Sequence, residues 1–168
     1  MDGSPGGRSQ LAAPPISFTD QADRAIEVSS FTGPSEPLVE MYEAFDTSSQ
    51  SQGVPPRTTE KVRSWVEHLL AEGENVVAVH EGDPVGHAVL IPYDDTSELA
   101  IFVHPEYQTA GIGTRLIRGL LGRGQSVGIE HVWLTVSRDN RIAMRLYRSA
   151  GFEVREDERG ELEMEREL

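Results

Sequence analysis

Hydrophobic positions recur along the chain with two different periods, and the change of period predicts a protein of mixed secondary structure. Alternating or continuous apolar runs, typical of strands, occupy residues 24–30, 75–95, 97–104, 131–137, 152–157 and 161–168. Apolar residues at helical spacing occupy residues 35–45, 58–71, 112–123 and 140–152. Residues 75–95 are expected to form a hairpin, and the last two strands a second one. The predicted order is strand, two helices, three strands, helix, strand, helix and two strands.

This order predicts an α/β (α+β) fold with a mixed, mostly antiparallel twisted sheet flanked by about four helices. Residues 131–137, "HVWLTVS", are nearly all apolar, as in a strand buried on both faces. The helix at 112–123 is expected to stop at the breaker "GRGQ", and the next helix at Gly151. Residues 47–56, "TSSQSQGVPP", are expected to form a polar loop.

The first fifteen residues differ in composition from the rest of the chain. Eight of them are Gly, Pro or Ser, which predicts a disordered leader over residues 1–15. The remainder, residues 16–168, is long enough to build one domain with its own core. We therefore predict a single folded domain over residues 16–168.

Composition narrows the class of protein. Cysteine is absent, and no apolar run approaches the ~20 residues of a membrane span, so a soluble cytoplasmic protein is expected. The net charge is −13, and Lys61 is the one lysine of the chain. This acidity speaks against nucleic acid as a partner and favours a salt-loving source; an acidic protein from an arginine-rich proteome is the alternative. The histidines show no metal-ligand spacing.

The positive charge is concentrated in one segment. Between residues 107 and 152 only Glu130 and Asp139 are acidic, against seven arginines: Arg115, Arg118, Arg123, Arg138, Arg141, Arg145 and Arg148. This pattern indicates an anionic ligand near that segment, although some of these arginines are expected to be ordinary helix surface.

The same segment contains a glycine-rich turn, "HPEYQTAGIGTRLI", between a predicted strand and a predicted helix. N–H groups at a helix start are unpaired and favour an anion, and Gly111 and Gly113 lack the side chains that would hold a phosphate away. A P-loop would need Lys after its last glycine, and a dinucleotide-binding turn would need glycine at position 116, which is Leu. Binding of ATP or NAD therefore stays a weak alternative.

Two motifs together resemble the GNAT N-acetyltransferase superfamily. Residues 108–113, "QTAGIG", are similar to its Gln/Arg-x-x-Gly-x-Gly/Ala signature, preceded by "VHPEYQ". Residues 140–152, "NRIAMRLYRSAGF", resemble its second motif, Asn-x-x-Ala-x-x-x-Tyr-x-x-x-Gly-Phe. The order of elements from about residue 24 to residue 168 also agrees with the fold of that family.

The resemblance implies a site for acetyl-CoA between two splayed strands, residues 98–104 and 132–137. The main chain of Ile101, Phe102 and Val103 would bind the pantetheine arm, which Asn140 and Ala143 would also contact. The pyrophosphate would lie on the backbone of Gln108, Thr109, Ala110, Gly111, Ile112, Gly113 and Thr114. No metal is implied, since coenzyme A supplies the sulfur and the protein supplies orientation and electrostatics.

Acid and base groups follow from the chemistry of acyl transfer. A phenol is protonated at neutral pH and can donate to a departing thiolate, so the match to the second motif makes Tyr147 the general acid. An ammonium acceptor must lose a proton before it attacks. Glu98 is the candidate base, directly or through a water; it resembles the strand glutamate of Pat-type protein lysine acetyltransferases. A strand-end glutamate that is merely exposed is the alternative.

The sequence predicts an acetyl-CoA-dependent N-acetyltransferase acting on a primary amine. A protein lysine or N-terminus is favoured over a small molecule, on the resemblance of Glu98 and residues 38–45, "LVEMYEAF", to the Pat type. A catalytically silent acyl-CoA-binding module that regulates a partner is an alternative of another class. A homodimer is left open.

Overall fold

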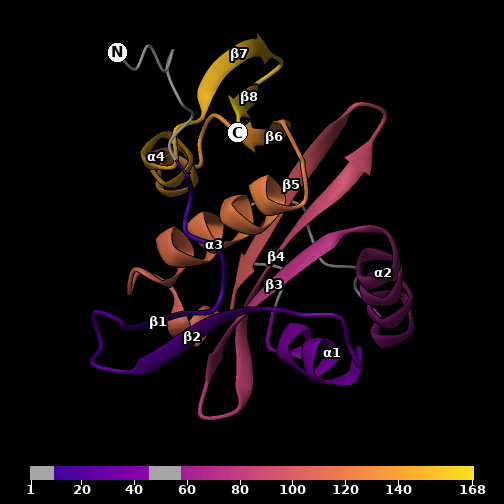
Figure 1. Ribbon diagram of the computed structural model, residues 1–168, viewed down its shortest axis with the longest axis vertical. Coiled ribbons are helices and arrows are strands. Elements are labelled where there is room, and N and C mark those ends of the chain that lie inside the picture. Colours follow the sequence, from indigo (N-terminus) through magenta and orange to yellow (C-terminus); the bar gives the residue numbers. More distant parts are fainter. Residues whose placement is uncertain (1–9, 46–57) are drawn as a thin grey trace, which may run out of the picture.

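The computed structural model describes residues 10–45 and 58–168, which form an eight-stranded sheet with helices on both faces (Figure 1). The order across the sheet is β1-β2-β3-β4-β5-β6-β8-β7, and each neighbouring pair is antiparallel except β5 and β6. The strands are β1 (Ile16–Thr19), β2 (Ala25–Ser30), β3 (Glu74–His80), β4 (Asp83–Tyr93), β5 (Thr96–Val103), β6 (His131–Ser137), β7 (Glu153–Glu158) and β8 (Glu161–Glu167). The predicted mixed, mostly antiparallel α/β fold is confirmed.

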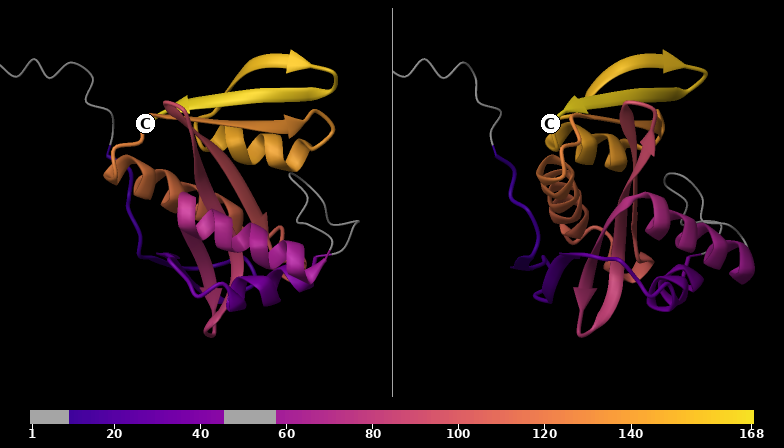
Figure 2. Two further views of the ribbon diagram at one scale, coloured as in Figure 1. Left: turned by 90° about the vertical axis from the view of Figure 1, so that its right-hand side faces the viewer. Right: turned by 45° about the vertical axis from the view of Figure 1, so that its right-hand side comes forward.

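The helices divide between the two faces of the sheet, as Figure 2 shows. Along β5, Leu99 and Ile101 belong to the core that α3 covers, whereas Ala100 and Phe102 belong to the core under α1 and α2. This alternation is the period of two that a strand imposes on its side chains. The helices are α1 (Glu36–Glu43), α2 (Thr59–Glu72), α3 (Ile112–Ser126) and α4 (Arg141–Ser149), with a 3-10 turn η1 (Pro105–Tyr107).

Helix α3 runs through the predicted breaker, so the expected end near Arg123 was wrong. Gly122 and Gly124 lie inside the helix because neighbouring groups come too close for a side chain. A Cβ at Gly122 would collide with the carbonyl oxygen of Ala12, and one at Gly124 would lie 2.6 Å from Leu90 Cδ1. Packing, rather than helix termination, accounts for these two glycines.

The start of the chain also differs from expectation. Strand β1 was not predicted as a separate strand, because four residues of partial burial carry too short a pattern. Residues 10–15, assigned to the disordered leader, lie along α3, where Leu11 N–H donates to Gln125 Oε1 over 2.8 Å. These six residues therefore pack with the domain. Residues 1–9 of the predicted leader and the predicted loop at 47–56 lie outside the described residues. Within the described ranges, no helix has the length and apolarity that a membrane crossing requires.

Candidate active site

Strands β5 and β6 pair only at one end and then separate. Their parallel register contains two pairs, Ser97 with Val132 and Glu98 with Trp133. Beyond them, residues 99–103 of β5 have no partner strand on the β6 side among the described residues. Both ribbon views of Figure 2 show β6 and the β7–β8 hairpin running away from β4 and β5. The predicted splayed strand pair is therefore present.

The main chain of β5 offers hydrogen-bonding groups to the resulting gap. His104 N–H donates to Val85 of β4 over 2.8 Å, and main-chain groups alternate sides along a strand. Val103 and Ile101 therefore direct their main-chain groups away from β4, as the bond from Gln108 Nε2 to the Val103 carbonyl confirms at 3.0 Å. Phe102 directs its main chain toward β4. Two of the three predicted strand residues thus face the gap with their main chain.

The predicted phosphate loop follows β5 and η1 directly. Gln108 and Thr109 are exposed, and Gly111 caps α3 with a left-handed φ of 88°, a conformation that favours glycine. No side chain caps the helix, so the N–H groups of its first turn remain available to an anion. Gly113 lies beside the side chains of Leu146 and Val103, which brings the loop, β5 and α4 together.

Helix α4 carries the predicted second motif. Asn140 Oδ1 accepts the Ala143 N–H over 3.0 Å and so caps this helix, a role that its sequence motif did not require. Ala143 and Tyr147 are buried in the same core cluster as Ile101. Burial raises the pKa of the Tyr147 phenol above its usual value of 10.0, which keeps it protonated and able to donate.

Glu98 lies at the last paired position of β5, where the strands begin to separate. Its side chain is on the face of β5 that Ala100 and Phe102 share, opposite Ile101. The carboxylate is half-buried, and desolvation raises its pKa above the usual 4.5. A carboxyl group of raised pKa is better matched to accepting a proton from an amine near neutral pH.

A series of buried, hydrogen-bonded polar side chains lies on the face of the sheet that α1 and α2 cover, and the sequence analysis did not predict it. Asn75 donates through Nδ2 to the carbonyls of Leu69 and Gly73, at 2.8 and 3.1 Å. Its Oδ1 must therefore accept from His87 Nε2 at 2.7 Å, which leaves His87 Nδ1 to accept the Tyr42 hydroxyl at 2.7 Å. His87 is thus neutral, and burial lowers its pKa from 6.5 to about 3. Its position in the apolar run "VGHAVL" was the available signal.

Aromatic rings cover this polar chain next to the gap. Tyr42 stands edge-on to Phe102 and Trp65, with ring centroids 5.4 and 5.1 Å apart. Trp65 in turn contacts Phe102 at 5.4 Å. Two helices and β5 are joined at this cluster, so it fixes the α1–α2 side of the candidate site to the central strand.

Charges around the site are unevenly distributed. Of the arginines in the basic segment, Arg123 pairs with Glu74 over 3.0 Å and Arg138 with Asp157. Arg115 and Arg118 of α3 are exposed, so they are among the arginines that could meet an anion. On the far side of the gap, β7 and β8 place glutamate opposite glutamate: Glu153 with Glu165, Glu156 with Glu163, and Glu158 with Glu161.

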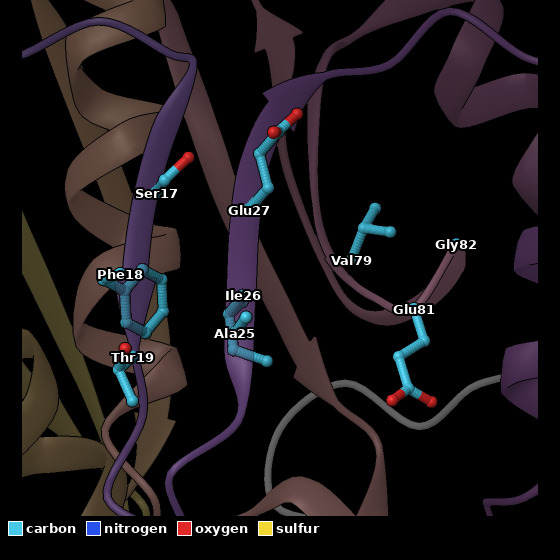
Figure 3. A pocket seen from close by; sticks show the side chains of 9 residues that line it. All are labelled: Ser17, Phe18, Thr19, Ala25, Ile26, Glu27, Val79, Glu81 and Gly82. Carbon is cyan, nitrogen blue, oxygen red and sulfur yellow. The ribbon is translucent and has the colours of Figure 1, made fainter.

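A shallow pocket elsewhere does not include the candidate residues. It lies on β1, β2 and the β3–β4 turn, where Figure 3 shows Glu27 and Glu81 at its rim. None of the predicted site residues lines it. Within residues 10–45 and 58–168, no three acidic or histidine side chains gather as a metal site would require.

The chain matches the acetyltransferase (GNAT) family model over residues 38–152 and therefore belongs to that family. Over 94 residues it is 36% identical to the ribosomal protein bS18-alanine N-acetyltransferase of Escherichia coli, a match covering 52% of this chain and 64% of that enzyme. The chain spans about half the length of the first curated relatives that it matches.

Solved structures agree on the fold. The GNAT domain of S. lividans PAT superposes with a TM-score of 0.78 at 18% identity, covering 92% of this chain and 97% of that one. The PaiA N-acetyltransferase of Thermoplasma acidophilum, in complex with coenzyme A, gives a TM-score of 0.66 at 19% identity, covering 85% and 99%. The resemblance to the GNAT superfamily is confirmed, whereas the Pat-type resemblance and the salt-loving source stay predictions.

Proposed function

We propose that this protein transfers the acetyl group of acetyl-CoA to a primary amine of a polypeptide. The observation that carries the proposal is the separation of β5 from β6 immediately after Glu98, next to the glycine-capped start of α3. A gap with main-chain donors and acceptors along one wall suits the amide-containing pantetheine arm. A helix start without a capping side chain suits a pyrophosphate.

The residues divide into donor-holding and proton-transferring groups. The main chain of Ile101 and Val103 holds the pantetheine arm, and an N–H group of this strand polarises the thioester carbonyl. The loop from Gln108 to Thr114 holds the pyrophosphate. Glu98 takes the proton that the ammonium must lose, directly or through a water. The amine nitrogen then bonds to the carbonyl carbon, the carbon–sulfur bond breaks, and Tyr147 donates its proton to the leaving thiolate.

The acceptor is proposed to be a peptide amine, either an N-terminus or a lysine. The E. coli relative is named for an alanine of a ribosomal protein, which supports a polypeptide acceptor. Glu98 also lies on the α1–α2 face of the sheet, so the acceptor would approach from that side.

The test measures acetyl transfer from labelled acetyl-CoA to matched peptides that carry a free N-terminal alanine, an internal lysine, or both blocked. Polyamines and free amino acids form the small-molecule arm. We expect transfer to at least one peptide with a free amine and none to the blocked peptide. Transfer to small amines alone would contradict the polypeptide acceptor.

Tyr147→Phe separates an enzyme from a silent binding module. We expect kcat to fall about 100-fold or more, since a general acid contributes that much, while calorimetry finds acetyl-CoA affinity nearly unchanged. If the parent protein binds acetyl-CoA but acetylates none of the peptides or small amines, the proposal that it is an enzyme is wrong and a regulatory binding role is supported. Tighter binding of ATP or NAD than of coenzyme A would overturn the donor assignment.

A further inference from the structure

The turn between β1 and β2, residues 20–24, contacts the glycine loop from outside the gap. Gln21 N–H donates to the Ala110 carbonyl over 2.9 Å, a main-chain bond between residues far apart in sequence. Ala110 lies between Thr109 and Gly111, whose φ values of 60° and 88° are both left-handed. Such a backbone persists only where its surroundings hold it, and here one carbonyl is fixed by the β1–β2 turn.

The bond from Gln21 to Ala110 also sets the direction of the next main-chain N–H group, that of Gly111. Across a trans peptide the carbonyl and the following N–H point in opposite directions. With the Ala110 carbonyl directed at Gln21, the Gly111 N–H points away from the β1–β2 turn. Gly111 is the residue that caps α3, so this N–H stands at the positive end of the helix, where a phosphate would bind.

The turn itself is held rigidly by Asp20 and Arg24. The buried Asp20 carboxylate accepts the Ala22 and Arg24 N–H groups, both at 2.9 Å, and Arg24 Nε at 2.8 Å. Arg24 also lies 4.0 Å from the centre of the Tyr107 ring and donates to the Glu106 carbonyl at 3.4 Å. Both residues belong to η1, which connects β5 to the loop.

We propose that the β1–β2 turn is a positioning element for the phosphate loop, in which Gln21 N–H orients the Gly111 N–H and Arg24 fixes η1. The inference rests on the proposed function, because it assigns this loop to the pyrophosphate of coenzyme A. Its residues contact neither substrate. They act on donor affinity through the loop and leave the acceptor side, on the opposite face of the sheet, unchanged.

Gln21→Pro tests the main-chain bond. Asp23 N–H donates to the Asp20 carbonyl at 3.1 Å, so Gln21 occupies the second position of a turn, where proline is favoured. The variant replaces the N–H with the proline Cδ, which cannot donate and which displaces the Ala110 carbonyl from its present position 2.9 Å from the Gln21 nitrogen. The matched Gln21→Ala keeps the N–H and removes the side chain. We expect the proline variant to raise KM for acetyl-CoA and Kd for coenzyme A about tenfold, which equals about 1.4 kcal/mol. Its kcat at saturating donor stays near that of the parent, and the alanine variant behaves like the parent.

S-acetyl-pantetheine, which lacks the pyrophosphate, distinguishes orientation of the loop from general damage. We expect kcat/KM with this donor to be the same for the parent and Gln21→Pro. Should the proline variant fail to fold, Arg24→Ala with Arg24→Lys replaces it: Ala raises the Kd for coenzyme A, and Lys, which keeps a cation over Tyr107, restores part of the loss.

Unchanged coenzyme A affinity in Gln21→Pro or Arg24→Ala, or equal losses with both donors, would overturn the positioning role while the proposed function stands. A parent protein that binds no coenzyme A would overturn both.

Discussion

At the scale of single residues, Glu98 links position to chemistry. It is the last residue of β5 that pairs with β6, and desolvation raises the pKa of its carboxyl above 4.5. A base must be deprotonated to act, so activity should increase as pH rises through this raised pKa.

We therefore expect Glu98→Gln to lower kcat about 100-fold or more and to abolish the acid limb of the profile of kcat/KM against pH. Glu161→Gln, an exposed glutamate on β8, is the matched control and should leave both unchanged. An unaltered acid limb in Glu98→Gln would assign the base to another group.

His87 makes a second residue-scale prediction, on stability. Burial lowers the pKa of His87 to about 3 in the folded protein, so the neutral side chain makes its full contribution to the free energy of unfolding above pH 6.5. Below that, the unfolded chain binds a proton that the folded protein does not, so stability is lost as pH falls from 6.5 toward 3. The loss is roughly 1.4 kcal/mol per pH unit, which makes about 2 kcal/mol between neutral pH and about pH 5.

Urea unfolding at these two pH values measures the effect. His87→Gln should lose about 2 kcal/mol less than the parent on acidification, although it is less stable throughout. The control variant His68→Gln, at an exposed position, should show the same pH dependence of the free energy of unfolding as the parent. Equal pH dependence in His87→Gln and the parent would contradict the neutral, buried histidine.

At the scale of elements, α3 shows packing prevailing over local propensity. Alanine at Gly122 would favour the helix by up to about 1 kcal/mol in isolation. Its Cβ would collide with the Ala12 carbonyl, so we expect Gly122→Ala to displace residues 10–15 and to lower the free energy of unfolding by about 1–3 kcal/mol.

Urea unfolding and limited proteolysis near Leu11 check this prediction. Arg118→Ala, at an exposed position of the same helix, is the control for helix propensity. Increased stability of Gly122→Ala with unchanged protease resistance would show that the contact with Ala12 does not form.

The elements also show what sequence could predict. The helices, the two hairpins and the glycine loop follow from periodicity and from two motifs, since each depends on neighbours in sequence. The separation of β5 from β6 was expected only from the resemblance to the GNAT superfamily. The bond from Gln21 to Ala110 joins main-chain groups and leaves no side-chain pattern. The Tyr42–His87–Asn75 chain unites three separate segments, and only His87, which lies in an apolar run, gives a signal in the sequence. Such contacts require the assembled fold.

At the scale of the whole molecule, negative charge opposes the fold. The net charge is −13, and three glutamate pairs face each other directly across β7 and β8. Arg155 pairs with Glu165 of the first of them over 2.7 Å, which leaves Glu156 with Glu163 and Glu158 with Glu161 as the pairs of like charge. Like charges in directly opposed positions destabilise a sheet, and salt screens them.

We expect Tm to rise by about 4 °C or more between about 0.1 M and about 1 M KCl. The double variant Glu156→Gln, Glu163→Gln should melt higher in low salt and gain less from added salt. Thermal scans monitored by circular dichroism measure both. A Tm independent of salt would remove the support for a salt-loving source.

The parting of β5 and β6 gives the interior of the sheet an edge. Ile101 and Val103 lie on the central strand, yet within residues 10–45 and 58–168 their N–H groups have no strand partner of the kind that protects the amides of β4. When no acetyl-CoA is bound, these two N–H groups should exchange with deuterium as fast as the amides of an edge strand. The same bare edge could pair with the strand of another molecule. On the proposed function, the protein should aggregate most readily when it is depleted of acetyl-CoA, so the acetyl donor would also protect the protein against self-association.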